Sequence, residues 1–210
     1  MAGQDKQKFS NEEMDILKEV ASIGSGNAAT ALSQMVNKRL EIRVPETKII
    51  PVEKFPEQFS NPNEVVVATY MEIFGEISGE IILFFPRDNA MIFGDFLLGK
   101  ELTREDLVNE LSISMFKEIA NIVCSAYINS LAKICDLEIL PSVPHFSCDM
   151  LNAVIDFMLV KLSSKVDEAL YVNTSFEVEG HNIDGNMLVI LEEESLRKII
   201  SALQQKISDN

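Results

Sequence analysis

The chain has 210 residues, of which 47% are hydrophobic and 24% are charged, a mixture typical of a folded globular protein and not of a disordered one. Its 33 Asp and Glu residues outnumber 18 Lys and Arg residues, and the formal net charge of -15 disfavours nucleic acid as a partner because it repels phosphate. The polar N-terminus is unlike a signal peptide, and no apolar run approaches the ~20 residues of a membrane helix. We therefore expect a soluble cytoplasmic protein, without membrane insertion, that binds a protein partner.

A long helix is predicted to begin directly after Ser10. Ser10 and Glu13 form a capping-box pattern, in which each side chain can accept a hydrogen bond from the other residue's backbone N–H. Apolar residues then recur at helical spacing from Met14 to about Asn37.

Strands and a shorter helix are predicted to complete the first half. Runs rich in β-branched and aromatic residues indicate the strands, and Phe74-Gly75 is read as a turn between two of them. The predicted elements are strands over Val44–Val52, Val65–Ile73 and Glu76–Phe85 and a helix over Arg87–Leu98.

The second half repeats this order of elements. Thr103 and Asp106 form a weaker capping box ahead of a second long helix, whose apolar pattern reaches Leu131. Gly180-His181 is read as the hairpin turn. The remaining predictions are strands over Glu138–Leu140, Ala169–Glu179 and Asn182–Leu191 and a helix over Glu193–Gln205.

One segment, Asp149–Leu162, has no counterpart in the first half. It is predicted to form an extra apolar helix, one stripe of which belongs to the core. A second stripe, if exposed, would form a docking surface.

These elements predict an α+β fold, in which hairpins form an antiparallel sheet with two long helices against it and shorter helices at its flanks. No linker rich in Pro, Gly or Ser separates the halves. We expect residues 1–210 to form a single pseudo-two-fold domain, with a first repeat over about 10–99 and a second over about 103–206. Since the fused halves already supply what a dimer would, the pattern predicts a monomer.

The two halves also share a spaced set of residues, 99 positions apart. Three, two and 22 residues separate successive members of each set: Asp15, Glu19, Ser22 and Pro45, then Ser114, Glu118, Asn121 and Pro144. Such long matched spacing indicates a duplicated unit. Glu118 and Asn121 lie one turn apart on one helix face, so both can contact the same object. A single polar pair of this kind is ordinarily a solvated helix face, but its repetition at fixed spacing favours a function.

This pattern of Asp or Ser, Glu, Asn and Pro resembles the signature of the CheC, CheX and FliY family of chemotaxis phosphatases. Residues 23–33 also resemble the first helix of CheC proteins. The resemblance covers nearly the whole chain, and it is strongest to CheC members because the motif occurs twice and the length leaves no room for the additional domain of FliY members.

The resemblance implies hydrolysis of the aspartyl phosphate of the response regulator CheY. Glu118 would engage a lysine of the regulator, and Asn121 would orient the attacking water. An amide suits this role because it can accept from and donate to water without bringing negative charge near a phosphoryl group. Ser114 and, in the first copy, Asp15 are expected at the partner-binding surface.

The sequence offers neither a metal-ligand cluster nor a clamp of Arg and Lys, which phosphatases with their own complete sites use. His145 and His181 lie outside any ligand-spaced group. We therefore expect no metal or cofactor of the protein's own, and Mg2+ in the active site of the partner regulator.

The first copy departs from the motif, because Ser22 stands where the motif has Asn. Its hydroxyl is about two atoms shorter than a carboxamide, so the first site is expected to be weak or inactive. Since Asp15 and Glu19 are retained, this face either docks the regulator or is a structural remnant.

A second partner is also implied. CheC proteins bind the receptor deamidase CheD, and the region of the unmatched helix, with Asp149 at its start, is where we would place the contact. The alternative to a phosphatase is therefore a mainly non-enzymatic adaptor that binds and regulates CheD.

Residues 24–29 also fit a loose glycine-rich nucleotide fingerprint. That fingerprint requires a preceding strand, whereas a helical pattern precedes it here. We expect Gly24 and Gly26 to permit close helix packing instead.

Overall fold

The computed structural model describes residues 9–59, 61, 63–161, 166 and 168–208. Within these residues the elements follow in this order: α1 (Asn11–Val36), β1 (Leu40–Pro51), η1 (Val52–Gln58), β2 (Val65–Gly75), β3 (Gly79–Pro86), α2 (Arg87–Leu98), η2 (Glu105–Val108), α3 (Glu110–Cys135), β4 (Ile139–Pro141), β5 (His145–Met150), α4 (Leu151–Lys161), β6 (Glu168–Val178), β7 (His181–Leu191) and α5 (Glu193–Ser208).

The described strands form one antiparallel sheet, and its order interleaves the two halves of the chain. The order is β1-β6-β7-β3-β2-β4, and β5 also pairs with β2. The first strand of each half therefore pairs with the hairpin of the other half, β1 with β6 and β4 and β5 with β2. The predicted α+β fold with an antiparallel sheet and two long helices is confirmed.

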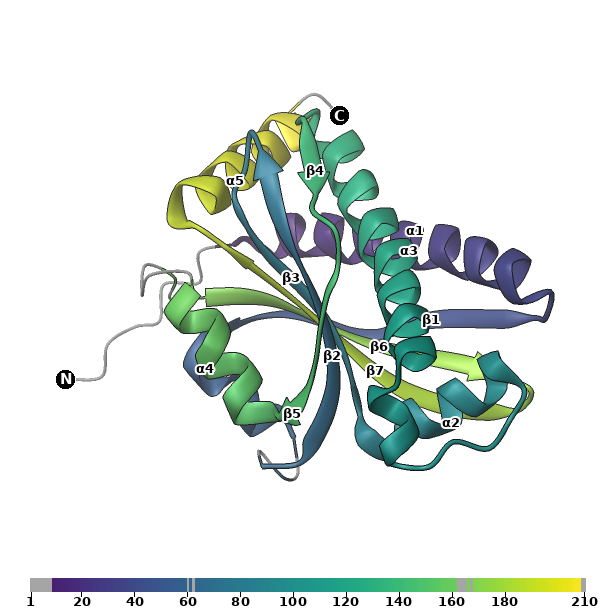
Figure 1. Cartoon of the computed structure of the whole chain (residues 1–210). Helices are drawn as coiled ribbons and strands as arrows, with labels where there is room; N and C mark the ends of the chain where they lie inside the picture. The colour runs from purple at the N-terminus through teal and green to yellow at the C-terminus, as the bar shows by residue number, and fades with distance from the viewer. Residues whose placement is uncertain (1–8, 60, 62, 162–165, 167, 209–210) are drawn as a thin grey trace.

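The sheet has a core on each side. Successive residues of β3 alternate between them, so that Leu83 and Phe85 face α1, α2, α3 and α5, while Ile82 and Phe84 face α4 and η1. Figure 1 shows α1 and α3 crossing over the same part of the sheet, with α4 set apart from both. By length and composition α3 could span a membrane, but half of that window is buried within the fold.

The crossing of α1 and α3 depends on one glycine. A Cβ atom at Gly24 would lie 2.9 Å from the Cα atom of Tyr127, closer than real Cβ contacts come. A Cβ atom at Gly26 would meet nothing within 4 Å. The predicted role in helix packing is thus correct for Gly24 and wrong for Gly26, which lies on the exposed side of α1.

The first helix begins where the sequence predicts. The Ser10 N–H donates to the Glu13 carboxylate at 2.6 Å, and the Glu13 N–H donates to the Ser10 hydroxyl at 3.2 Å. The structure therefore contains both bonds of the capping box.

The start of the second long helix differs from the prediction. Thr103 and Asp106 do form reciprocal hydrogen bonds, but these lie at the start of the short 3-10 helix η2 and not at the start of α3. The N-cap of α3 is Asn109, whose side-chain oxygen accepts from the N–H of Ser112 at 2.9 Å. The helical conformation is interrupted between η2 and α3 because Asn109 has extended backbone angles.

The predicted helix from Asp149 is also shorter than expected. Asp149 and Met150 end the edge strand β5, which pairs with β2 and was not predicted, and α4 begins at Leu151. Leu162, the predicted end of this helix, lies outside the described residues.

Candidate functional site

The second motif occupies the exposed face of α3. Ser114, Glu118 and Asn121 are exposed, whereas Phe116 and Ile119 on the opposite face are fully buried. The helical spacing explains this separation, because residues three, four and seven apart share a face and the apolar residues between them face the sheet.

This face of α3 forms one wall of a surface depression. Its lining consists of four residues of α3, the last residue of β4 and the three residues that follow it: Ser114, Lys117, Glu118, Asn121, Pro141, Ser142, Val143 and Pro144. The structure thus brings all four members of the second motif together, and the 22-residue interval is the length of chain needed to leave α3 and return to its exposed face.

Pro144 lies in a bulge of the sheet. From Pro141 to His145 the chain advances four residues while β2 advances three, so one residue is extra. Proline has no N–H to donate to the ladder, so it favours such a break. The break turns Ser142–Pro144 out of the sheet and toward α3.

The first motif proline lies at the equivalent place. From Arg43 to Glu46, β1 advances three residues while β6 advances two, which is again one extra residue around Pro45. Here the strand continues through the bulge, whereas in the second half the same bulge separates β4 from β5. The matched positions of Pro45 and Pro144 therefore reflect a bulge that is present in both halves.

Ser142 fixes the shape of the second bulge. Its N–H donates to the Glu72 carbonyl oxygen at 2.8 Å, and its hydroxyl accepts from the Glu72 N–H at 2.9 Å. The hydroxyl also donates to the Val143 carbonyl oxygen at 3.0 Å. Val143 is left 75% exposed at the rim of the depression.

Lys117 is a cation of the site that the sequence analysis did not single out. It is half-buried in the wall of the depression and makes no ion pair with any described residue. Its counterpart in the first motif, Lys18, is paired with Asp15 at 2.8 Å. The 99-residue offset that relates the motifs also relates these lysines, and it is the signal that could have found Lys117.

The first motif is exposed on α1. Asp15, Glu19 and Ser22 all face outward, and Pro45 is exposed in β1. Besides the shorter Ser22 side chain, this copy differs from the second in that its first residue is an acid that neutralises the neighbouring lysine.

Asp149 lies at another place on the surface. It lines a separate depression beside α4, together with Phe146, Ala153 and Phe157. Its carboxylate accepts from the Met150 N–H at 2.7 Å, at the junction of β5 and α4. It is therefore not brought together with the residues of the α3 depression.

Neither histidine lines the α3 depression. His145 stacks on Tyr70 with ring centroids 5.2 Å apart, and His181 is exposed at the start of β7. Among the described residues no group of three or more His, Cys, Asp or Glu side chains could hold a metal ion.

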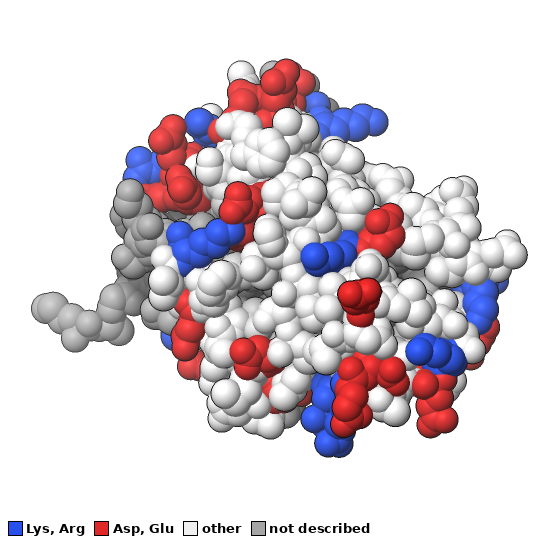
Figure 2. All heavy atoms as spheres, viewed as in Figure 1, with Lys and Arg blue, Asp and Glu red and all other residues white. Residues whose placement is uncertain are grey.

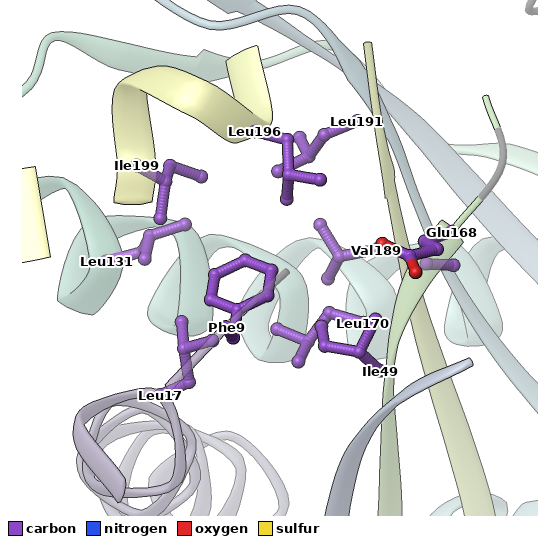
Figure 3. Close-up of a pocket in the computed structure, with 11 residues that line it drawn as sticks. Phe9, Leu17, Ile49, Leu131, Glu168, Leu170, Val189, Leu191, Leu196 and Ile199 are labelled. Carbon is purple, nitrogen blue, oxygen red and sulfur yellow. The ribbon is translucent and has the colours of Figure 1, made fainter. Parts of the chain in front are cut away.

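A small apolar cavity lies between α1, α3, α5 and the sheet. Phe9 projects into it among Leu17, Leu131 and Ile199, as Figure 3 shows, and Glu168 is the one ionisable residue in its lining. Its side chains offer packing rather than chemistry.

Comparison with known proteins agrees with this geometry. The model of the CheC-like family matches residues 12–49 and 111–148. Each match contains one motif helix and the strand segment with its motif proline. The chain is 31% identical over 196 residues to the CheY-P phosphatase CheC of Bacillus subtilis (strain 168), an alignment that covers 91% of this chain and 94% of that protein.

Solved structures share the fold. FliY of Thermotoga maritima superposes with a TM-score of 0.76 at 19% identity, over 95% of this chain and 100% of that one. CheX in the CheX-CheY-BeF3-Mg2+ complex of Borrelia burgdorferi superposes with a TM-score of 0.50 at 16% identity, over 83% and 97% of the two chains. The sequence identity over nearly the full length, together with both matches to the family model, shows that this chain belongs to the CheC-like family.

Proposed function

We propose that the protein hydrolyses the aspartyl phosphate of the response regulator CheY at the depression of α3. The observation that carries the proposal is the exposed pair Glu118 and Asn121, one turn apart, with the motif proline of a bulge across from it. The Bacillus subtilis relative is a CheY-P phosphatase, which supports the same reaction. The CheX neighbour, solved with CheY, BeF3 and Mg2+, supports a regulator as the partner.

In this mechanism the protein completes an active site that belongs mostly to the regulator. Glu118 pairs with a lysine of the regulator and fixes the docked orientation. Asn121 enters beside the phosphoryl group, where its carbonyl oxygen accepts a hydrogen bond from the attacking water and its NH2 group remains a donor.

The reaction is then an in-line displacement. The water oxygen attacks phosphorus, the bond between phosphorus and the aspartate oxygen breaks, and the aspartate leaves as a carboxylate. The proton lost by the water passes to the released phosphate. When bound in the regulator, Mg2+ would supply neutralisation of the phosphoryl oxygens, and in this proposal Glu118 and Asn121 contribute orientation.

The second copy of the motif carries the activity in this proposal. Ser22 cannot place an amide beside the phosphoryl group, so the α1 face is weak or serves only in docking. The protein is further proposed to be cytoplasmic. It is also proposed to act as a monomer, because the two halves of the sheet already complete each other.

The loss of phosphoryl groups from phosphorylated CheY tests this function. Asn121→Ala and Glu118→Ala are each expected to reduce the acceleration by about 100-fold, the usual effect of removing one positioned polar group. Glu19→Ala is the matched control on the first copy and is expected to have a much smaller effect. Full activity of Asn121→Ala would exclude this site, and a wild-type protein that does not accelerate the loss would exclude the function.

A specific surface favours the adaptor as a second function. Met150, at the end of β5, and Phe157 and Val160 of α4 are 48%, 52% and 80% exposed, although other residues of α4 are in the core. Exposed apolar side chains next to Asp149 are suited to docking a protein such as CheD. Phe157→Ser is expected to weaken CheD binding at least tenfold in calorimetric titration while the CheY phosphatase rate is retained. Unchanged binding would exclude this surface.

A further inference from the structure

We propose that Lys117 is a recognition residue of the α3 depression, whose ammonium group contacts an oxyanion at the phosphorylation site of the regulator. The inference rests on the proposed function and adds to it the cation that receives the anionic partner. It also assigns a role to the first motif residue, Asp15 or Ser114, which determines whether the nearby lysine is free to bind an anion of the partner.

The position of Lys117 on α3 places it beside Asn121. The two residues are four apart, which makes them neighbours on the helix surface at a Cβ separation of about 5–6 Å. Glu118 precedes Asn121 by three residues and is its neighbour on the other side. A group that Asn121 approaches is therefore within reach of both a carboxylate and an ammonium group, all in the same depression.

The adjacent turns of α3 offer Lys117 no acidic partner. The residues that can face it at three and four positions on either side are Ile113, Ser114, Ala120 and Asn121, none of which is acidic. No described residue forms an ion pair with it. The ammonium group of this half-buried residue is therefore available to an anion from outside.

The first copy provides an internal comparison. Lys18 occupies the same position relative to its motif, and it is paired with Asp15 at 2.8 Å. The equivalent of Asp15 is Ser114, a neutral residue. The lysine on α1 therefore has an acidic neighbour at the first motif position, whereas the lysine on α3 has the neutral Ser114 there. The two copies also differ at the third motif position, which is Ser22 in the first and Asn121 in the second.

The charge of the whole protein makes a local cation necessary. With a net charge of -15, the chain repels a partner whose binding face carries a phosphoryl group. In Figure 2 a few basic and acidic side chains lie among uncharged ones in the middle of the view, and acidic side chains are more frequent toward its rim. Because Lys117 lies beside Glu118 in the depression, this face carries less net negative charge than the whole molecule, which reduces the repulsion where the phosphoryl group approaches.

Four proteins test the proposal, namely the wild type, Lys117→Met, Ser114→Asp and the double variant, assayed for loss of phosphoryl groups from CheY. Lys117→Met is expected to raise KM about tenfold and to change kcat less than about twofold. Ser114→Asp is expected to pair with Lys117 and raise KM similarly. The double variant should be no worse than either single variant, because both changes remove the same free charge.

Controls separate this effect from general electrostatics. Lys18→Met removes a cation that is already paired, so its KM is expected to stay within about twofold of the wild type. The difference in KM between the wild type and Lys117→Met should shrink between about 50 and about 300 mM salt, because screening weakens the contact. Thermal unfolding of each variant checks that the fold is intact.

An unchanged KM in Lys117→Met would overturn the proposal. A loss from Ser114→Asp that persists in full in the Lys117→Met background would also overturn it, since the new carboxylate would then act by itself. If the wild type does not accelerate the loss at all, the phosphatase function fails, and calorimetric binding of BeF3-bound CheY to the wild type and Lys117→Met still tests Lys117. If Lys117→Met binds only BeF3-bound CheY more weakly than the wild type does, Lys117 contacts the phosphoryl oxygens. If it binds unmodified CheY equally more weakly, Lys117 contacts a carboxylate of the regulator.

Discussion

Ser142 and Glu72 bind each other through two hydrogen bonds, from the Ser142 N–H to the Glu72 carbonyl oxygen at 2.8 Å and from the Glu72 N–H to the Ser142 hydroxyl at 2.9 Å. In the second bond a side chain replaces the backbone acceptor that a regular ladder would supply. Both backbone groups of Glu72 therefore keep a hydrogen bond at the bulge, and Ser142–Pro144 remains attached to the sheet while it faces α3.

Ser142→Ala tests this attachment. The Glu72 N–H would lose its acceptor, and the free energy of unfolding is expected to fall by about 1 kcal/mol. Because the bulge walls the depression, the KM for phosphorylated CheY should rise as well. Ser147→Ala in β5 is the control, since the Ser147 hydroxyl makes no hydrogen bond with a described residue. Equal denaturation midpoints for both variants would show that the Ser142 hydroxyl does not hold the bulge.

The contact between α1 and α3 predicts opposite effects at two glycines. Gly24→Ala would place a Cβ atom 2.9 Å from the Cα atom of Tyr127, a backbone atom that cannot move without separating the helices. We expect a loss of about 1–3 kcal/mol in the free energy of unfolding. Gly26→Ala meets nothing within 4 Å and should gain up to about 1 kcal/mol from better helix propensity. Urea denaturation measures both, and a neutral Gly24→Ala would contradict the close packing.

Glu72 and Glu80 share Lys161 and should show opposite pH dependence. Lys161 lies 2.7 Å from the carboxylate of Glu80, which is 3% exposed and opposite Glu72 in the β2–β3 pair. Desolvation raises the pKa of Glu80 despite that ion pair. The hydrogen bond from Lys161 lowers the pKa of Glu72, which stays in contact with water.

The signs follow from linkage. A raised carboxyl pKa stabilises the fold fully below the ordinary value of 4.5, and this contribution is lost as the pH rises through the folded-state value. A lowered pKa stabilises the fold above 4.5, and that contribution is lost as the pH falls through the folded-state value. From pH 4 to pH 7 the free energy of unfolding of Glu80→Gln should therefore increase relative to that of the wild type. That of Glu72→Gln should decrease relative to the wild type over the same range. Parallel curves for the two variants would refute the assignment.

Substitutions in the first motif copy test whether it can take over the proposed phosphatase activity. In an Asn121→Ala background, Ser22→Asn restores the amide of the first copy and should raise phosphatase activity if the α1 face docks the regulator. Adding Asp15→Ser, which frees Lys18, should raise the activity further and lower KM. If neither variant exceeds the Asn121→Ala background, the first copy is a structural remnant.

Much of the fold could be predicted because its signals are local. The capping box of Ser10 and Glu13 and the apolar periodicity of both long helices depend on neighbours within one or two turns. The edge strand β5 was not predicted although its residues, His145 to Met150, alternate polar and apolar side chains, because the run is short and its last two residues were assigned to the helix predicted from Asp149. Its conformation comes from pairing with β2.

The sequence by itself determined the duplication, the exposed face that carries Glu118 and Asn121, and the difference between Asn121 and Ser22, because spacing along a helix dictates which residues share a face. Only the tertiary structure decided that the bulge at Pro144 faces that helix, that Ser142 holds it there and that Lys117 is free while Lys18 is paired. Those relationships join segments that are distant in the chain, or depend on which rotamer a side chain adopts, and spacing alone carries no information about either.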